Sequence, residues 1–422
     1  MLHSRALQLT ALLSAFFVLS ACQKDAVENP EDIASIRART RSTLTPMQQL
    51  GKQIFFDARL SEPMGVQSCA SCHAPEVGFS GFSDIPTGGA AAASGFKRGW
   101  VAGIGEGAAV GVFGRRKPQS AAYASQSPVM SFDGVEFTGG LFWDGRATGL
   151  RLGSPVAEQA LGPFLASKEQ NHPSPASVLA KLKSNRSYLA LWNSVYGVAD
   201  IDMSTTDAIN LNYDRIGFAI EAYETSPEVN QFSSKFDAYM AGRATLTAQE
   251  TEGMRLFNNE AGCNDCHKQL GGNKNRPFVV GESFADFAFH NIGIPQNPNN
   301  PGGNLVPDPG LGGFLATAAD PTWRAQATNN IGKFRTPTLR NVGKAKRFMH
   351  NGVFSSLEQV VHFYNTRDVP GAGWNGVPWG APEYVPTMDI QALGNLGLTP
   401  VQEAAVVAFL RTMSDGYTGV TQ

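Results

Sequence analysis

The chain has 422 residues, enough for two or three domains, and its formal net charge of −2 gives no indication of nucleic-acid binding. Only 17% of the residues are charged, whereas glycine (45) and proline (25) are frequent. This composition favours a loop-rich protein over a simple helical bundle.

The N-terminus has the pattern of an export signal. His3 and Arg5 precede an apolar run over 6–19 that is too short to span a membrane. Small residues then lead to Cys22, so we expect residues 1–22 to be a lipoprotein signal peptide whose lipidated Cys22 anchors the chain to a membrane face. The alternative is an ordinary cleaved signal with an incidental cysteine. Residues 23–43 are polar without an apolar period, which predicts a flexible tether.

A helix is predicted to begin at Thr45-Pro46, an N-cap followed by proline at the first helical position. Leu50, Ile54 and Phe55 follow at helical spacing and precede the pentapeptide Cys69-Ala70-Ser71-Cys72-His73.

The second half of the chain repeats this plan. A capping-box pattern over 247–250 is followed by Gly253, Leu256 and Phe257, and then by Cys263-Asn264-Asp265-Cys266-His267. We therefore expect an internal duplication.

Both pentapeptides are C-x-x-C-H, the attachment signature of a c-type haem. Two thiols at this spacing can add to the two vinyl groups of a porphyrin, and the adjacent histidine presents a nitrogen to the iron. Alternatives are a chance match, a redox C-x-x-C or a zinc ribbon, which the histidine in both copies and the export signal disfavour. The fifth cysteine is Cys22, so no pair remains for a disulfide.

The predicted fold class is mainly α, with two cytochrome-c-like domains over 44–235 and 236–422 that each bind one covalent haem c. Long irregular loops are expected over 78–114 and 270–330. Helical patterns cover 176–195, 205–224, 356–366 and 399–413. The last has a Thr399-Pro400 cap, and Ala404, Val407, Ala408 and Leu410 are expected along its buried side.

The predicted helix over 356–366 presents two faces with different chemistry. At about 100° per residue, Leu357, Val361 and Tyr364 fall within about 60° of one another. His362 lies about 160° from Tyr364, so the two side chains cannot face one cofactor.

Further strings resemble the bacterial di-haem cytochrome c peroxidase/MauG family: Phe142-Trp143-Asp144-Gly145-Arg146, Glu158-Gln159-Ala160-Leu161-Gly162-Pro163, Thr336-Pro337-Thr338-Leu339-Arg340-Asn341-Val342 and Met349-His350-Asn351-Gly352. The resemblance covers roughly residues 45–413. The segment over 143–150 is most similar to the MbnH-like branch, which is thought to modify tryptophan on a secreted partner protein.

The resemblance implies unequal roles for the two haems. The N-terminal haem, attached through Cys69 and Cys72 with His73 as its ligand, would meet peroxide at an open sixth position. No histidine stands between His73 and His172 to close that position.

By family position, the distal pocket of the first haem would hold Gln159, Pro163 and Glu169. Glu169 would move the peroxide proton, Gln159 would hydrogen-bond the bound oxygen and Pro163 would limit access. The alternative for Glu169 is a solvated loop carboxylate beside Lys168.

The second haem, attached through Cys263 and Cys266 with His267 as its ligand, would take a sixth ligand fourteen residues after His350. That position is methionine in the peroxidases and is Tyr364 here, as in MauG. A phenolate lowers the iron's reduction potential, which favours substrate oxidation over peroxide detoxification. The alternatives are ligation by His362 or a tyrosine of the core.

Trp143 matches the tryptophan between the haems of relatives and would carry oxidising equivalents, the alternative being a core tryptophan. Any exposed member of the other tryptophans would relay them to a partner (Trp100, Trp192, Trp323, Trp374, Trp379). Relatives hold calcium between the haems, at positions that match Lys117, Ala345 and Arg347. Because Lys117 cannot ligate a hard cation, calcium is doubtful.

The favoured function is a periplasmic, lipid-anchored di-haem oxidoreductase that uses H2O2 to form a bis-Fe(IV)-like state. That state would oxidise a tryptophan on a secreted partner, with copper-binding proteins among the candidates. Two alternatives stay open. One is a cytochrome c peroxidase that reduces H2O2 with electrons from a small redox protein, and the other is a non-enzymatic, lipid-tethered electron-transfer cytochrome.

Overall fold

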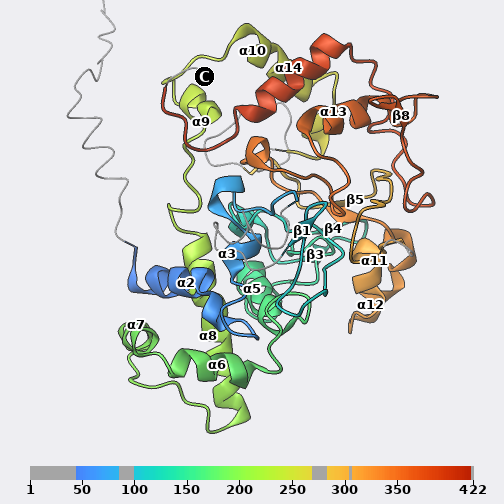
Figure 1. Ribbon diagram of the computed structural model, residues 1–422. Helices are drawn as coiled ribbons and strands as arrows, with labels where there is room; N and C mark the ends of the chain where they lie inside the picture. Colours follow the sequence, from blue (N-terminus) through green and yellow to red (C-terminus); the bar gives the residue numbers. More distant parts are fainter. Residues whose placement is uncertain (1–43, 85–98, 269–282, 304–306, 420–422) are drawn as a thin grey trace, which may run out of the picture. The chain divides into compact units, whose positions relative to one another are not determined.

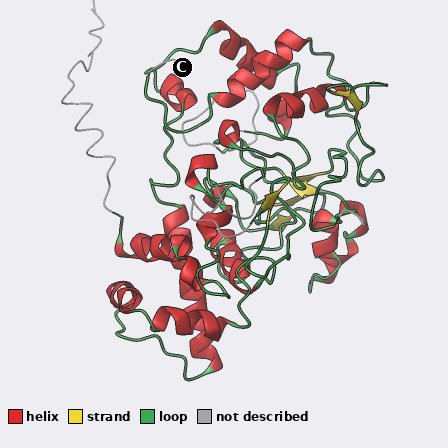
Figure 2. Cartoon of the chain, viewed as in Figure 1, coloured by secondary structure: helices red, strands yellow, loops and turns green. Residues whose placement is uncertain are grey.

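The computed structural model describes residues 44–84, 99–268, 283–303 and 307–419. The predicted signal peptide with Cys22 and the predicted tether lie outside these residues. Helices and irregular loops make up most of the described chain, and the strands are very short (Figure 2). The prediction of a mainly α fold is therefore confirmed. Among the described residues, no helix has both the length and the apolar character needed to cross a membrane.

The N-terminal half contains the first pentapeptide, whose first four residues form the short helix α3 (Cys69–Cys72; Figure 1). The other helices of this half are α2 (Pro46–Phe56), α5 (Pro155–Leu165), α6 (Pro175–Lys183), α7 (Arg186–Tyr196) and α8 (Thr206–Glu224), with 3-10 turns at Ala58–Leu60, Pro75–Val77 and Ala124–Gln126.

The C-terminal half contains the second pentapeptide in a 3-10 turn, Cys263–Asp265. Its helices are α9 (Lys235–Met240), α10 (Ala248–Asn258), α11 (Gly310–Leu315), α12 (Pro321–Ala325), α13 (Leu357–Thr366) and α14 (Pro400–Arg411), with further 3-10 turns at Thr328–Asn330 and Val342–Lys344. The short helices α11 and α12 lie in a stretch that the sequence predicts as irregular.

The described segments contain four two-stranded antiparallel ribbons: β1 (Trp100–Val101) with β2 (Ile104–Gly105), β3 (Ser131–Phe132) with β4 (Phe137–Thr138), β5 (Phe289–His290) with β6 (Phe334–Arg335), and β7 (Gly373–Trp374) with β8 (Val377–Pro378). In the third ribbon Phe289 faces Arg335 and His290 faces Phe334. This pairing holds two segments of the C-terminal half beside each other.

The predicted helix starts are confirmed in atomic detail. Thr45 forms a capping box with Gln48 at the start of α2, and Thr247 forms one with Glu250 at the start of α10. The remaining predicted helices appear as α8, α13 and α14, whereas the pattern over 176–195 is divided into α6 and α7. The division falls at Asn185, whose side chain caps the second helix by accepting a hydrogen bond from the Ser187 amide.

The predicted duplication is visible in how two helix pairs pack. In α2, a Cβ on Gly51 would lie 1.8 Å from the Ala219 carbonyl oxygen of α8. In α10, a Cβ on Gly253 would lie 1.9 Å from the Ala405 carbonyl oxygen of α14. Each glycine stands six residues after its capping threonine, so both halves bring a helix against its partner at the same point of the repeat.

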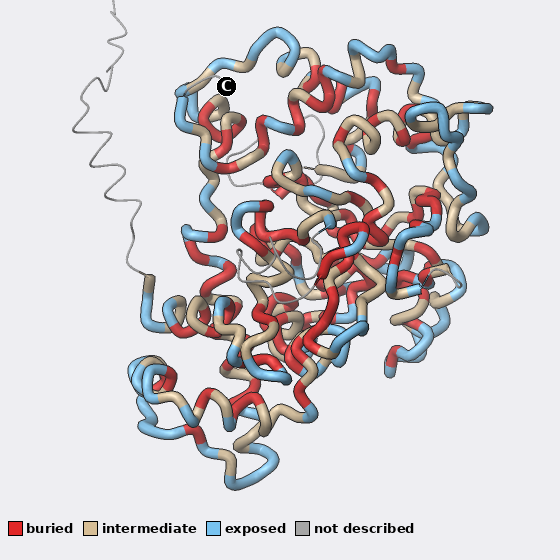
Figure 3. The backbone as a smooth tube through the Cα atoms, in the orientation of Figure 1, coloured by how far each residue is buried: buried red, intermediate tan, exposed pale blue. Residues whose placement is uncertain are grey.

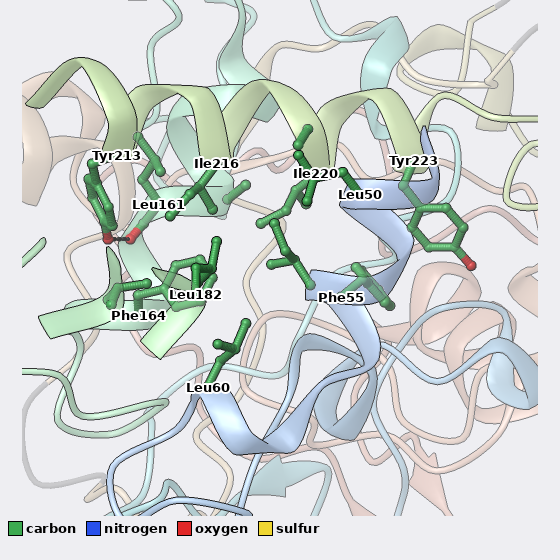
Figure 4. Packing of buried hydrophobic residues seen from close by; sticks show 14 of the residues in the cluster. Leu50, Phe55, Leu60, Leu161, Phe164, Leu182, Tyr213, Ile216, Ile220 and Tyr223 are labelled. Atoms are coloured by element: carbon green, nitrogen blue, oxygen red, sulfur yellow. Dashed lines mark hydrogen bonds between the residues drawn. The ribbon is translucent and has the colours of Figure 1, made fainter. Parts of the chain in front are cut away.

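The buried apolar residues form two large clusters, one in each half. The first joins α2, α5, α6, α7 and α8, and Figure 4 shows Leu50, Phe55, Ile216 and Ile220 meeting within it. There the Tyr213 hydroxyl donates to the Leu161 carbonyl at 2.7 Å. The second begins at Phe236 and joins α10, α13 and α14. Two cytochrome-c-like domains follow from this arrangement, while the boundary between 235 and 236 stays a prediction.

One predicted helix face was wrong in part, since Val407 and Leu410 are buried as expected but the two alanines are not. Ala404 is exposed and Ala408 is half-buried, whereas the buried side of α14 carries Ala405, Val406, Val407, Phe409 and Leu410. The buried face turns towards Gly253 of α10, a contact that periodicity within α14 cannot reveal. Figure 3 shows buried residues on the inner sides of the helices and in the central loops.

Candidate functional site

The first pentapeptide places two thiols and an imidazole at one cavity. Ser68 precedes α3, and its amide donates to the Ser71 hydroxyl at 3.0 Å, which fixes the turn that carries Cys69 and Cys72. The Nδ1 atom of His73 lies 3.2 Å from the Phe79 carbonyl oxygen. An Nδ1–H donated there leaves the lone pair on Nε2. Burial lowers the pKa of His73 to about 4, so the ring is neutral, the form that ligates a metal.

The second pentapeptide repeats this geometry around another cavity. Cys263 and Cys266 line it together with His267, whose Nδ1 atom lies 3.0 Å from the Phe284 carbonyl oxygen. Burial also lowers the pKa of His267. In each half, therefore, a backbone carbonyl six or more residues beyond the motif orients the histidine.

The first cavity has a volume of about 1770 Å³ and brings together the three predicted distal residues, Gln159, Pro163 and Glu169. The first two lie on α5. The Glu158 carboxylate accepts hydrogen bonds from the amides of Gly149, Arg151 and Leu152 and so ties the start of α5 to the preceding loop. The three predicted residues thus share one cavity with both cysteines of the first motif.

Glu169 is held at this cavity by its backbone. Its amide donates to the Ala166 carbonyl at 2.9 Å, and its carbonyl accepts from the Ala108 amide at 2.7 Å. Its carboxylate makes no hydrogen bond to the described residues. Burial raises the pKa of Glu169, and the charges of Lys168 and Arg146 oppose this rise. Glu169 is half-buried and lines the cavity, so it is not a fully solvated loop residue. Its neighbour Lys168 is exposed.

Glu224 is a second acid of the first cavity, and the sequence analysis did not single it out. It is 5% exposed at the end of α8, and its carboxyl group makes no hydrogen bond to the described residues. Burial, reinforced by the charge of Glu221, raises the pKa of Glu224 to about 8. Its position in the sequence, one residue beyond Tyr223 and four beyond Ile220 on the same predicted helix, was the signal that could have indicated its burial.

The second cavity, of about 1490 Å³, receives Tyr364 from α13. Leu357, Val360 and Val361 line it from the same helix, as the predicted face requires. His362 instead points away, and its Nδ1 atom lies 2.9 Å from a Glu403 carboxylate oxygen.

The phenol oxygen of Tyr364 makes no hydrogen bond to the described residues. By contrast, Tyr123, Tyr188 and Tyr213 each donate their hydroxyl to an oxygen of the chain. Burial, with the nearby sulfur atoms of Cys266 and Cys263, raises the pKa of Tyr364 above its ordinary value. Within the described part of the chain, therefore, no hydrogen-bond donor stabilises a phenolate there, and a cation inside the cavity would do so.

Trp143 lines both cavities. Its indole N–H donates to the Lys117 carbonyl at 2.7 Å, and its own carbonyl accepts from the Arg335 amide at 2.9 Å. The ring also meets His350 edge to face, with centroids 6.4 Å apart. Segments from both halves of the chain therefore hold Trp143 in place.

The backbone beside Trp143 and His350 is strained at matching positions. Phe142 and Met349 both adopt left-handed conformations, with φ of 62° and 68°. His350 stacks on Phe334 at 3.6 Å between centroids, and its Nε2 atom lies 3.0 Å from a Glu383 carboxylate oxygen. Strained backbone of this kind persists where the surrounding contacts hold it in place. Here the contacts of Trp143 and His350 hold the strained residue that precedes each of them.

Comparison with known proteins identifies the family. Residues 45–245 match the family model described as di-haem cytochrome c peroxidase. The methylamine utilization protein MauG of Paracoccus denitrificans is 32% identical over 376 residues, which are 87% of this chain and 88% of that protein. The chain belongs to the di-haem cytochrome c peroxidase/MauG family. It is therefore an oxidoreductase, and the family uses two haem groups.

Solved structures agree with this assignment. The di-haem peroxidase BthA from Burkholderia thailandensis E264 is 32% identical, covers 87% of this chain and 86% of its own, and superposes with a TM-score of 0.68. A MauG-like protein associated with microbial copper homeostasis is 24% identical, with coverage of 88% and 90% and a TM-score of 0.58. The second likeness concerns the fold alone.

The two cavities fit the haem groups of this family. The second cavity has a mainly apolar wall, yet Arg335 Nε and Thr336 Oγ1 are buried there without a hydrogen-bond partner among the described residues. Burial lowers the pKa of Arg335 to about 10, with only Asp286 opposing it. An anionic propionate group would satisfy this guanidinium. In the first cavity, Gln67 Oε1 and Gln170 Oε1 are also buried without a hydrogen-bond partner among the described residues.

The positions that match the family's calcium ligands contain a cation of the chain. Lys117 is buried, and its ammonium donates to the Ser80 hydroxyl and the Pro118 carbonyl, both at 2.9 Å. Its backbone amide donates to the His350 carbonyl at 2.7 Å. Arg347 instead pairs with Asp84 at 2.7 Å. A buried ammonium would repel Ca²⁺, which gives a physical reason to doubt calcium binding here. The absence of calcium stays a prediction.

Proposed function

We propose that this chain is a di-haem oxidase that uses H2O2 to withdraw electrons from a tryptophan of a secreted partner protein. The observation that carries the proposal is the phenol oxygen of Tyr364, which reaches the second cavity without a hydrogen bond to the described residues. Besides His267, two other histidines line this cavity, but His290 is paired with Asp286 at 2.9 Å and His350 with Glu383 at 3.0 Å. We therefore propose Tyr364, rather than either of these paired histidines, as the second ligand of the iron that this cavity would hold.

When bound, the two haems would supply O–O bond cleavage at the first cavity and storage of oxidising equivalents at both. We propose that each is attached covalently through its C-x-x-C-H motif, with His73 and His267 as iron ligands. Retention of both haems after denaturation in acidified acetone tests the attachment. Loss of either haem in that solvent would contradict it.

Glu169 would move the proton in the first cavity. Its carboxylate accepts the proton of incoming H2O2 and returns it to the departing oxygen, which leaves as water. A pKa raised by burial suits this role, because a more basic carboxylate takes up the peroxide proton more readily. Gln159 would hold the bound oxygen by a hydrogen bond, while Pro163 would narrow the approach from α5.

The second cavity would exclude water from the Tyr364 side. Leu357, Val360 and Val361 present only aliphatic groups beside the phenol. An anionic oxygen donor in such surroundings stabilises the oxidised iron and lowers its reduction potential. Trp143, which lines both cavities, is proposed as the bridge for electrons between them.

We further propose a periplasmic location with a lipid anchor at Cys22, a tryptophan-modifying activity of the MbnH-like kind, and a secreted partner. A copper-binding protein is the partner to be tested first, since a MauG-like protein of the same fold is associated with copper homeostasis. Labelling of Cys22 with radioactive palmitate in growing bacteria tests the anchor, and a soluble, unlabelled product would contradict it.

The decisive experiment mixes the purified holoprotein and a candidate partner with H2O2 and measures the partner's tryptophan-bearing peptides by mass spectrometry. We expect oxidation of a tryptophan that requires both the enzyme and peroxide. Unchanged peptides from every co-exported partner would contradict the proposal.

The second candidate function is a cytochrome c peroxidase, which the likeness to the di-haem peroxidase BthA favours. It requires a high-potential second haem that accepts electrons from a small redox protein. A redox titration separates the two functions, since Tyr364 ligation predicts a low potential at the second haem.

A further inference from the structure

A series of aromatic rings leads from Tyr364 to the surface hairpin of β7 and β8. Phe363, the neighbour of Tyr364 on α13, has its ring centroid 6.4 Å from the phenol. The Trp379 indole packs edge to face on Phe363 at 5.2 Å. His362 then lies 5.9 Å from Trp379 and 5.8 Å from Trp374. We call these four residues, Phe363, Trp379, His362 and Trp374, the exit cluster.

The exit cluster ends in solvent. Phe363 is fully buried, Trp379 and Trp374 are partly exposed, and Val377, which pairs with Trp374 across the hairpin, is 68% exposed. The hairpin adjoins α13 in Figure 1. A short run of side chains therefore connects the second cavity with the outside.

The other tryptophans do not offer this connection. Trp100 and Trp192 are buried, and Trp143 lies between the cavities. Trp323 is partly exposed, but it packs on Phe137 and Phe314 in a separate cluster that contains no residue of either C-x-x-C-H motif. Judged by the ring contacts among the described residues, only Trp374 and Trp379 combine partial exposure with a connection to Tyr364.

The surroundings of the exit cluster favour one-electron oxidation without loss of a proton. The Trp379 indole N–H donates to the Thr366 hydroxyl at 3.1 Å, and that hydroxyl donates to the His362 carbonyl at 2.7 Å. Neither oxygen is a base, so an oxidised Trp379 keeps its proton. The Glu403 carboxylate beside His362 adds a negative charge that stabilises a cation on either indole.

We propose that Trp379 and Trp374 carry electrons inward from the surface to the Tyr364 side of the second cavity, with Trp374 as the residue that the partner reduces. This inference rests on the proposed function. Each indole gives up one electron inward, becomes a radical cation, and is restored by the next electron from outside, so both end unchanged. Two such electrons and two protons convert one H2O2 into two waters. The partner is thus oxidised by two electrons overall.

The test uses the holoprotein without any partner, so that oxidising equivalents accumulate on the chain itself. After treatment with H2O2, peptide mass spectrometry should find oxygen added to Trp374 and Trp379 before any other tryptophan. In Trp379→Phe the amount of oxygen added to Trp374 should fall by about tenfold, which corresponds to a barrier higher by about 1.4 kcal/mol. The matched control Trp323→Phe should leave the oxidation of Trp374 unchanged, and haem absorption spectra confirm that the variants fold.

Three results would overturn the relay: an intact Trp374, equal oxidation of Trp323 and Trp374, or unaltered oxidation of Trp374 in Trp379→Phe. Peroxide consumption is measured in the same samples. A chain that consumes peroxide but leaves Trp374 unoxidised refutes the relay alone. A chain that consumes no peroxide refutes the proposed function and the relay with it.

Discussion

The two cavities share one construction and differ in their linings. Both are preceded by a helix that starts at a threonine capping box, carries glycine at a helix crossing and ends before a C-x-x-C-H motif. The first cavity then receives two acids without hydrogen-bond partners among the described residues, the half-buried Glu169 and the buried Glu224. The second receives a phenol and aliphatic side chains. Duplication thus fixes where a cofactor is held, while later segments fix what the site can do.

The unequal linings come from segments that are remote in sequence. The first cavity is completed by α5, by the loop over 168–170 and by the end of α8. The second is completed by α13 and by the strands β5 and β6. Of the described residues, only Trp143 lines both cavities, which makes it the point at which the two sites can be connected.

Replacing Glu169 tests the first half of this comparison and has the largest expected effect. Glu169→Gln keeps the shape of the side chain but removes the proton acceptor. The reaction with H2O2 should slow by about 10²- to 10⁴-fold, the usual contribution of a general acid–base group. Stopped-flow absorbance of the holoprotein measures the rate.

The matched control for that variant is Glu76→Gln, the same substitution at an exposed glutamate that follows the first motif. Its peroxide rate should equal that of the wild type. Equal rates for Glu169→Gln and Glu76→Gln would remove Glu169 from proton transfer.

Replacing Tyr364 tests the second half. Tyr364→Phe should raise the midpoint potential of the second haem by on the order of 0.1 V, a fraction of the ~0.8 V over which axial ligands set haem potentials. Spectroelectrochemical titration measures the shift. Met349 also lines this cavity, so Met349→Leu is the control. If Met349→Leu shifts the potential and Tyr364→Phe does not, the ligand is the methionine.

The sequence predicted the parts of this comparison that depend on local pattern. Thr45, Thr247 and the orientation of Tyr364 relative to His362 follow from capping chemistry and helical period alone. The buried face of α14 was partly misjudged because the contact at Gly253 decides it. Glu224 and Arg335 were missed, and the sequence could not select Trp374 and Trp379 from the other candidate tryptophans, because each choice depends on neighbours that only the folded chain brings together.

The acid Glu224 sharpens the comparison through pH. Because the pKa of Glu224 is raised to about 8, the native chain keeps a proton that the unfolded chain releases near pH 4.5. Stability contributed by this group is therefore full below pH 4.5 and falls by up to about 1.4 kcal/mol per pH unit as the pH rises towards 8.

In Glu224→Gln this slope should disappear, because the amide does not titrate. Urea unfolding of the holoprotein at pH 5, 6, 7 and 8 gives the difference between variant and wild type. A difference that stays constant with pH would show that Glu224 is ionised in the folded protein.

The smallest predicted effect concerns Trp143, where the two cavities meet. Trp143→Phe keeps an aromatic ring but removes the indole N–H, which leaves the Lys117 carbonyl without its buried donor. Trp192→Phe is the matched control, because Trp192 is fully buried and its Nε1 atom has no hydrogen-bond partner among the described residues. Both changes remove similar volume, so their difference isolates the hydrogen bond. Urea unfolding should find Trp143→Phe less stable than Trp192→Phe by about 1 kcal/mol. If the two variants lose equal stability, the indole is held by packing alone, and the bridge between the cavities lacks the fixed orientation that we infer.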